Sequence, residues 1–187
     1  MSETSLAPLR ILIVEDSEQM RALLQALLEA MSITDILFAE DGEKGHALYM
    51  ETTPDIVITD GAMSPIDGYE LTDRIRTDPN NPNPYVPIIM LSGHLEKERV
   101  EKARASGVTE YLAKPVSWHT LYERLVAIVG NPSFFIRTPT YLGPDRRRET
   151  EELYQGPDRR HIDPKPAKSA DIVTLDKVRQ QADVTKS

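Results

Sequence analysis

The chain has 187 residues, a formal net charge of −8 and no cysteine. This length suggests one domain with some extra chain, or two very small domains. The lack of cysteine excludes disulfides, thiol catalysis and cysteine-based zinc sites, and it fits a reducing compartment. The sequence contains no apolar run near the roughly 20 residues that span a bilayer, and no signal-peptide pattern at its start. We therefore expect a cytoplasmic protein without a membrane span.

The charge is unevenly distributed along the chain. Residues 1–130 carry 21 acidic and 11 basic residues, a charge of −10, whereas residues 131–187 carry 9 acidic and 11 basic residues, a charge of +2. Nucleic-acid binding draws on the neutralisation of phosphates by Lys and Arg. The first part is therefore a poor candidate for nucleic-acid binding and a plausible cation site.

The first half of the chain alternates predicted strands and helices. In chain order these are a strand at 11–14, a helix over 20–31, a strand at 36–39 and a helix around 47–48. The first run, Ile11-Leu12-Ile13-Val14, lacks strict alternation and is typical of a strand that is buried on both faces. The helix after it has apolar residues at i, i+3, i+4 and i+7, and Asp16 or Ser17 can cap it.

The second half continues this alternation. Its predicted elements are strands at 56–58, 88–91 and 111–113 and helices around 71–75, over 96–105 and over 118–128. The segment 96–105 is very polar, so its helix should be largely exposed, and Gly130 can end the last helix. Five strand–helix repeats in about 130 residues predict an α/β fold, a doubly wound parallel sheet of five strands with helices on both faces.

The character of the sequence changes after Gly130. Six prolines occur in residues 131–187, and apolar periodicity fades, so we expect a flexible, largely irregular C-terminal extension. A Tyr-x-Gly-Pro-Asp-Arg-Arg unit occurs twice, at 141–147 and at 154–160. A short final helix is possible around 172–178. The expected organisation is one domain at 1–130 followed by this extension.

Polar side chains follow the predicted strands. They are Glu15 and Asp16 after the first strand, Asp60 at the end of the third, Ser92 after the fourth and Lys114 after the fifth. Ligands of open parallel sheets bind beyond the carboxyl ends of the strands, so these side chains should converge at one edge. Each residue alone also has a structural explanation, as a helix-start acid, a turn acid or an ordinary loop residue.

The motifs around these residues resemble the receiver domain of response regulators in two-component systems. They are Val14-Glu15-Asp16, Thr59-Asp60-Gly61-Ala62-Met63-Ser64-Pro65-Ile66-Asp67-Gly68, Leu91-Ser92-Gly93 and Lys114-Pro115. The combination is specific because four separated motifs occur in the family's order, and it covers roughly residues 8–130. It implies a flavodoxin-like strand order of 2-1-3-4-5.

The resemblance also implies roles for single residues. Asp60 would accept a phosphoryl group from a histidine kinase or phosphotransfer protein, since carboxylates are known nucleophiles of this kind. Mg²⁺ would be held by Glu15, Asp16, Asp60 and the Ala62 carbonyl. Lys114 would neutralise the phosphoryl group, Ser92 would donate its hydroxyl to it, and Tyr111 would act with Ser92 as the switch pair. Ala62 and His94 would flank the site.

Two other functions can be considered for the body of the chain. A flavodoxin-like protein that binds FMN shares the strand pattern, but residues 15–18 are acidic and lack glycine, so they would repel a flavin phosphate. A phosphatase of the haloacid dehalogenase type needs an Asp-x-Asp pair after the first strand, which this chain lacks.

No enzyme motif, zinc ligand set or helix-turn-helix pattern follows residue 130, so we expect signalling through protein–protein contacts and not catalysis. The implied output surface is residues 94–129, and phosphate shuttle or sink remains an alternative role. The extension could be a docking arm, which would include self-association, or a passive tail. Nucleic-acid binding through Arg146-Arg147-Arg148 and Arg159-Arg160 is disfavoured by the interspersed acids.

Overall fold

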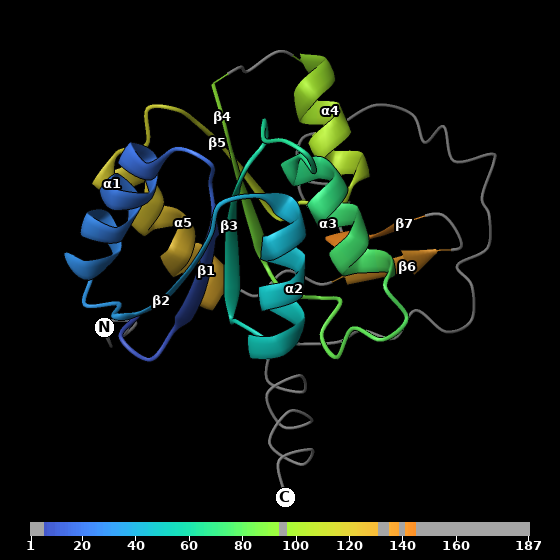
Figure 1. The fold of residues 1–187 in the computed structure, drawn as a ribbon, viewed down its shortest axis with the longest axis horizontal. Coiled ribbons are helices and arrows are strands. Elements are labelled where there is room, and N and C mark those ends of the chain that lie inside the picture. Colours follow the sequence, from blue (N-terminus) through green and yellow to red (C-terminus); the bar gives the residue numbers. More distant parts are fainter. Residues whose placement is uncertain (1–5, 94–96, 131–134, 139–140, 145–187) are drawn as a thin grey trace, which may run out of the picture.

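The computed structural model describes residues 6–93, 97–130, 135–138 and 141–144, and its centre is a parallel sheet of five strands (Figure 1). The strands are β1 (Arg10–Val14), β2 (Asp35–Ala39), β3 (Ile56–Asp60), β4 (Ile88–Ser92) and β5 (Glu110–Ala113). Their order, β2-β1-β3-β4-β5, confirms the predicted topology. Because β1 and β3 are neighbours, the loop after β1 lies beside the end of β3.

Five helices connect and flank these strands, again as predicted. They are α1 (Glu18–Glu29), α2 (Gly42–Thr52), α3 (Gly68–Thr77), α4 (Lys97–Ala105) and α5 (Trp118–Gly130). Figure 1 shows α1 and α5 on one side of the sheet and α2, α3 and α4 on the other. No helix among the described residues has both the length and the apolar character needed to cross a membrane.

The sheet is buried on both faces, which explains its continuous apolar runs. Ile11 and Ile13 of β1 belong to the core beneath α1 and α5, whereas Leu12 and Val14 belong to the core beneath α2 and α3. Successive side chains of a strand point to opposite faces, so one unbroken run of β1 supplies both cores.

Side-chain caps fix where three helices begin. The hydroxyl of Ser17 accepts from the Met20 amide and caps α1, which decides between the two predicted caps. Asp41 caps α2, and Asp67 caps α3 by accepting from the Glu70 amide. Such caps satisfy amides that have no partner within the helix.

Gly68, the first residue of α3, allows this helix to pack directly against the end of β3. A Cβ atom at Gly68 would lie 2.1 Å from the Asp60 carbonyl oxygen, far inside contact distance. The chain therefore needs glycine here to bring the start of α3 against the strand that ends in Asp60.

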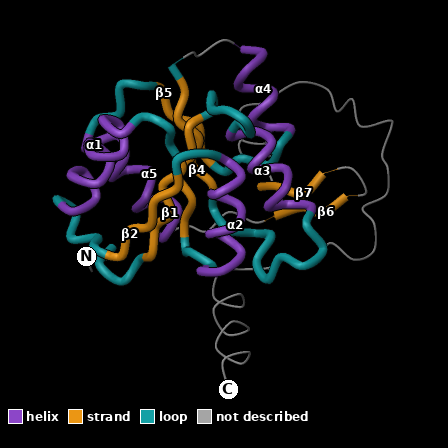
Figure 2. The backbone as a smooth tube through the Cα atoms, viewed as in Figure 1, coloured by secondary structure: helices purple, strands orange, loops and turns teal. Residues whose placement is uncertain are grey.

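A C-terminal hairpin was not predicted from the sequence. Strands β6 (Phe135–Thr138) and β7 (Tyr141–Pro144) pair antiparallel, and Phe135 and Leu142 are buried. The hairpin lies beside α3 (Figure 2), and β7 contains the first four residues of the first repeated unit. The second unit at 154–160 and the possible helix at 172–178 lie outside the described residues.

Replacing Gly68 with alanine should lower the free energy of unfolding by about 1–3 kcal/mol, the usual cost of forcing atoms into a packed site. Urea unfolding measures this change. The control is Gly130→Ala, where a new Cβ atom meets nothing within 4 Å, and its effect should stay within about 0.5 kcal/mol. Equal stability of the Gly68→Ala and native proteins would contradict the proposed packing role of this glycine.

Candidate functional site

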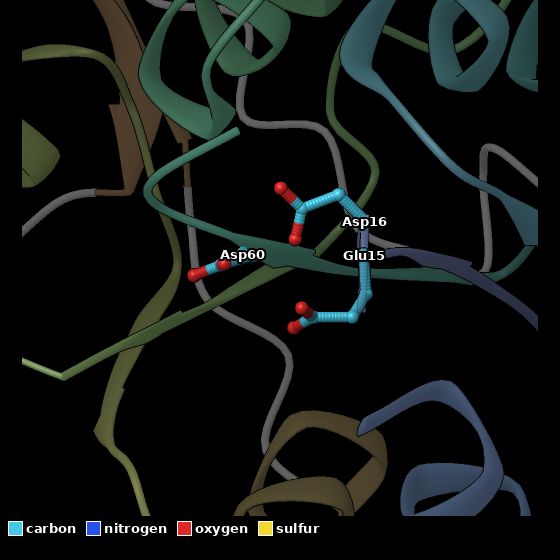
Figure 3. Close-up of side chains that lie close together, drawn as sticks. All are labelled: Glu15, Asp16 and Asp60. Carbon is cyan, nitrogen blue, oxygen red and sulfur yellow. The ribbon is translucent and has the colours of Figure 1, made fainter. Parts of the chain in front are cut away.

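Three carboxylates meet at the carboxyl edge of the sheet. Glu15 and Asp16 follow β1, and Asp60 ends β3; the three can each offer one oxygen within 4.8 Å of the others. Figure 3 shows these side chains gathered beside the end of β3. The predicted convergence of these residues is therefore seen, and its cause is the neighbouring position of β1 and β3.

The cluster is unevenly exposed. Glu15 is 1% exposed and Asp60 is 7% exposed, whereas Asp16 is exposed to solvent. Burial raises the pKa of Glu15, an effect that its hydrogen bond from Lys114 partly offsets. Because carboxylates repel one another when they are close, such a cluster favours a bound cation.

Lys114 supplies one positive charge to this cluster. Its Nζ lies 2.8 Å from Glu15 Oε2 and 3.1 Å from Asp60 Oδ2. Burial acts to lower the pKa of Lys114, but its bonds to the two carboxylates outweigh burial and leave that pKa raised. The ammonium group therefore stays charged at neutral pH and bridges two strand ends.

Backbone pairing places the other predicted residues beside the cluster. Ser92 ends β4 and is buried, and its carbonyl accepts from the Lys114 amide at 2.8 Å. The Gly61 amide donates to the Leu91 carbonyl at 2.8 Å, which fixes the chain just after Asp60. The ends of β3, β4 and β5 are thus tied together at this edge.

Arg21 was not singled out in the sequence, yet it holds the loop that bears two of the carboxylates. Its Nη1 donates to the carbonyl of Glu15 at 2.7 Å and to that of Asp16 at 3.1 Å. Within the same loop, the Ser17 amide donates to Glu15 Oε1 at 3.3 Å. The helical position of Arg21, one turn after the cap, is the only sequence signal that could have indicated this role.

A cleft of about 680 Å³ opens beside the carboxylates. It is lined by Asp16, Gly61, Ala62, Met63, Ser64, Asp67, Tyr69, Arg99 and Lys102. Ala62, predicted to flank the site, therefore lies in its wall. On the far side, the Lys102 ammonium lies 3.3 Å from Asp67 and 4.2 Å from the centre of the Tyr69 ring. The cleft thus connects the acidic edge with α4.

Tyr111, the predicted switch residue, lies half-buried on β5, an edge strand. It packs against the cluster that contains Tyr69 and Met90. Burial, reinforced by Tyr111, raises the pKa of Tyr69 to about 12. The position of Tyr111 agrees with a switch residue and also with an ordinary edge-strand tyrosine. His94 lies outside the described residues.

The fold and the acidic edge together define a receiver domain of the two-component phosphorelay. The chain belongs to the family of response regulator receiver domains, whose family model matches residues 11–126. Receiver domains of this family are signalling domains and are not classed as enzymes.

Individual relatives agree with this assignment. The chain is 32% identical to the chemotaxis protein CheY1 of Helicobacter pylori over 123 residues. This alignment covers 65% of this chain and 98% of that protein. It is 27% identical over 149 residues to the response regulator protein VraR of Staphylococcus saprophyticus, covering 79% of this chain and 69% of that protein. A putative response regulator of Chloroflexus aurantiacus superposes with a TM-score of 0.60 at 28% identity, over 66% of this chain and 98% of that one.

Replacing Glu15 with glutamine should stabilise the metal-free protein at pH 7. The pKa of Glu15 is raised in the folded state, so protonation favours folding, and this contribution is lost as pH rises through that pKa. A neutral side chain removes the penalty, while Lys114 keeps Asp60 as a partner. We expect a gain of roughly 0.5–2 kcal/mol in the free energy of unfolding.

Urea unfolding with a chelator present, at pH 7 and near pH 4, measures this effect. The gain should shrink at the lower pH, because Glu15 then becomes protonated in the native protein too. Glu51→Gln, on the exposed surface of α2, is the matched control. A loss of stability for Glu15→Gln at pH 7 would show that the ionised carboxylate is net stabilising.

Proposed function

We propose that Asp60 accepts a phosphoryl group from the phosphohistidine of a histidine kinase or phosphotransfer protein. An Asp60 carboxylate oxygen would attack phosphorus, the O–P bond would form, and the N–P bond to the imidazole would break. Receiver domains pair with histidine kinases, which supplies the class of donor. The observation that carries the proposal is the position of Asp60, whose carboxylate lies within 4.8 Å of two others and 3.1 Å from the Lys114 ammonium.

The residues around Asp60 fit the charge that arrives with the phosphoryl group. Lys114, which already contacts the Asp60 carboxylate, would neutralise part of that charge. Ser92, at the end of the adjacent strand, would donate its hydroxyl to a phosphoryl oxygen. Transfer of this kind needs mainly positioning and charge neutralisation, and these groups provide both.

The acidic cluster fits Mg²⁺, which prefers oxygen ligands and keeps several waters. Glu15, Asp16 and Asp60 would hold the ion, with the carbonyl of Ala62 as a further ligand. The three clustered carboxylates and the Lys114 ammonium together leave an excess of negative charge, which supports a divalent cation here. When bound, the ion would supply positive charge close to the transferred phosphoryl oxygens.

The phosphorylated domain would signal to a protein partner through residues 94–129, with Ser92 and Tyr111 as the switch pair. The alternative role is that of a phosphate shuttle or sink in a multistep relay. The cytoplasmic location and the low tendency to bind nucleic acid stay predictions. A docking or self-association role of residues 131–187 also stays a prediction.

Incubation with Mg²⁺ and acetyl phosphate should add one phosphoryl group to the native chain and none to Asp60→Asn. Intact mass spectrometry detects the addition directly. Asp73→Asn, an exposed acid on α3, should be phosphorylated like the native chain. Equal gain by Asp60→Asn would mean that another residue is the acceptor, and no gain by the native chain from either acetyl phosphate or a phosphohistidine protein would sink the proposal.

Replacing Arg21 with alanine should weaken Mg²⁺ binding roughly 10-fold, in line with other residues that orient metal ligands. The reason is that two carbonyls of the loop carrying Glu15 and Asp16 lose their charged donor. Calorimetric titration of the phosphate-free protein with Mg²⁺ measures the change. Gln25→Ala on the same helix is the control. The conservative variant Arg21→Lys should keep part of the Mg²⁺ affinity that Arg21→Ala loses. Unchanged Mg²⁺ affinity in Arg21→Ala would refute the positioning role.

A further inference from the structure

The buried guanidinium of Arg76 links α3 to the turn that follows α4. Arg76 is 3% exposed, and its Nε and Nη2 donate to the Gly107 carbonyl at 3.2 and 3.0 Å. Its Nη1 donates to the Pro84 carbonyl at 2.8 Å. Burial lowers the pKa of Arg76 to about 10, so the group is still charged at neutral pH. Both acceptors are neutral carbonyls, which makes this arrangement sensitive to any loss of its cover.

The first strand of the C-terminal hairpin provides that cover. The ring of Phe135 lies over the Arg76 guanidinium, 5.1 Å from ring centre to Cζ. The same ring meets Tyr85 edge to face at 5.8 Å between centres. Cation–π contacts of this kind are strongest when water is excluded, as it is around Arg76.

The second strand contacts the same turn through backbone. A Cβ atom at Gly107, which has a φ of +88°, would lie 2.3 Å from the Leu142 carbonyl oxygen. A Cβ atom at Gly143 would lie 2.9 Å from the Gly107 Cα and 2.2 Å from the Tyr141 hydroxyl. The Tyr141 hydroxyl donates to the Pro144 carbonyl at 3.3 Å. Tyr141 and Gly143 of the first repeated unit therefore pack closely together and against the turn at Gly107, with almost no free space between them.

The turn held in this way follows the carboxyl end of α4, a helix with little buried surface in its described part. Between residues 99 and 105 only Ala103 is buried, and Lys102 is an exposed contact to Asp67. Elements with little buried apolar surface are the first to shift or open. The segment that contains α4 starts at Ser92, beside Asp60, and ends at Gly107, beneath the hairpin.

We propose that the β6–β7 hairpin is a clamp on the turn after α4, and that phosphorylation of Asp60 releases it. This inference rests on the proposed function. A phosphoryl group that engages Ser92 would bias the position of α4, and any displacement of Gly107 spoils the close contacts with Leu142 and Gly143. Release would free the β6–β7 hairpin, including Tyr141–Pro144 of the first Tyr-x-Gly-Pro-Asp-Arg-Arg unit, for contact with a protein partner.

Amide hydrogen exchange of the full chain tests the release. With Mg²⁺ and acetyl phosphate, amides of residues 135–144 should exchange at least about 5-fold faster in the native protein, the lower limit of typical coupling between sites. The Asp60→Asn protein should show no change. Phosphoryl gain with unchanged or slower exchange in 135–144 overturns the clamp alone, whereas no phosphoryl gain overturns the proposed function and the clamp together.

Coupling between two sites is reciprocal, which gives a second test. Phe135→Ala uncovers Arg76 and should loosen the hairpin without phosphate. The same variant should bind the phosphoryl analogue beryllofluoride, with Mg²⁺, about 5-fold more tightly. The reason is that binding then spends less free energy on opening the hairpin. Arg137→Ala, an exposed position on the same strand, is the control. Unchanged beryllofluoride affinity in a folded Phe135→Ala protein that shows faster exchange in 135–144 would overturn the coupling.

Discussion

The structure depends on the bridge that Lys114 makes between Glu15 and Asp60. Two carboxylates that are almost fully buried would repel each other, and the ammonium group at 2.8 and 3.1 Å offsets that repulsion. The bridge joins the ends of β1, β3 and β5, so it organises the functional edge. Burial still raises the pKa of Glu15, and the hydrogen bond from Lys114 only partly offsets this. Three carboxylates beside one ammonium group are the basis of the cation site proposed above.

Packing beneath the site leaves Asp60 little freedom to move. Gly68 brings the start of α3 against the Asp60 carbonyl, and Arg21 fixes the loop after β1 from the opposite side. Asp60 is thus held by backbone contacts on neighbouring strands and not by its own side chain alone. A group placed so firmly can respond to phosphate mainly through the less buried elements nearby, of which α4 is the clearest.

The hairpin extends this logic to the far end of α4. Its contacts with the receiver body include Phe135 on a guanidinium and Gly143 on another glycine, and apolar periodicity indicates neither of these contacts. For this reason a composition rich in proline and charge indicated an irregular extension, although residues 135–138 and 141–144 form strands. These contacts show the structural role of Tyr141–Pro144, the first four residues of the first Tyr-x-Gly-Pro-Asp-Arg-Arg unit.

The sequence alone determined the strand–helix alternation and the residues of the acidic edge. Continuous apolar runs such as Ile11–Val14 can be satisfied only in a sheet covered on both faces, and the polar residues that follow them must then lie at one edge. Only the tertiary structure decided which partners meet there. The bonds of Lys114 to Glu15 and of Arg76 to Gly107 depend on how distant segments meet in space. Local periodicity records which face a residue occupies, but it carries no information on which neighbour that face will meet.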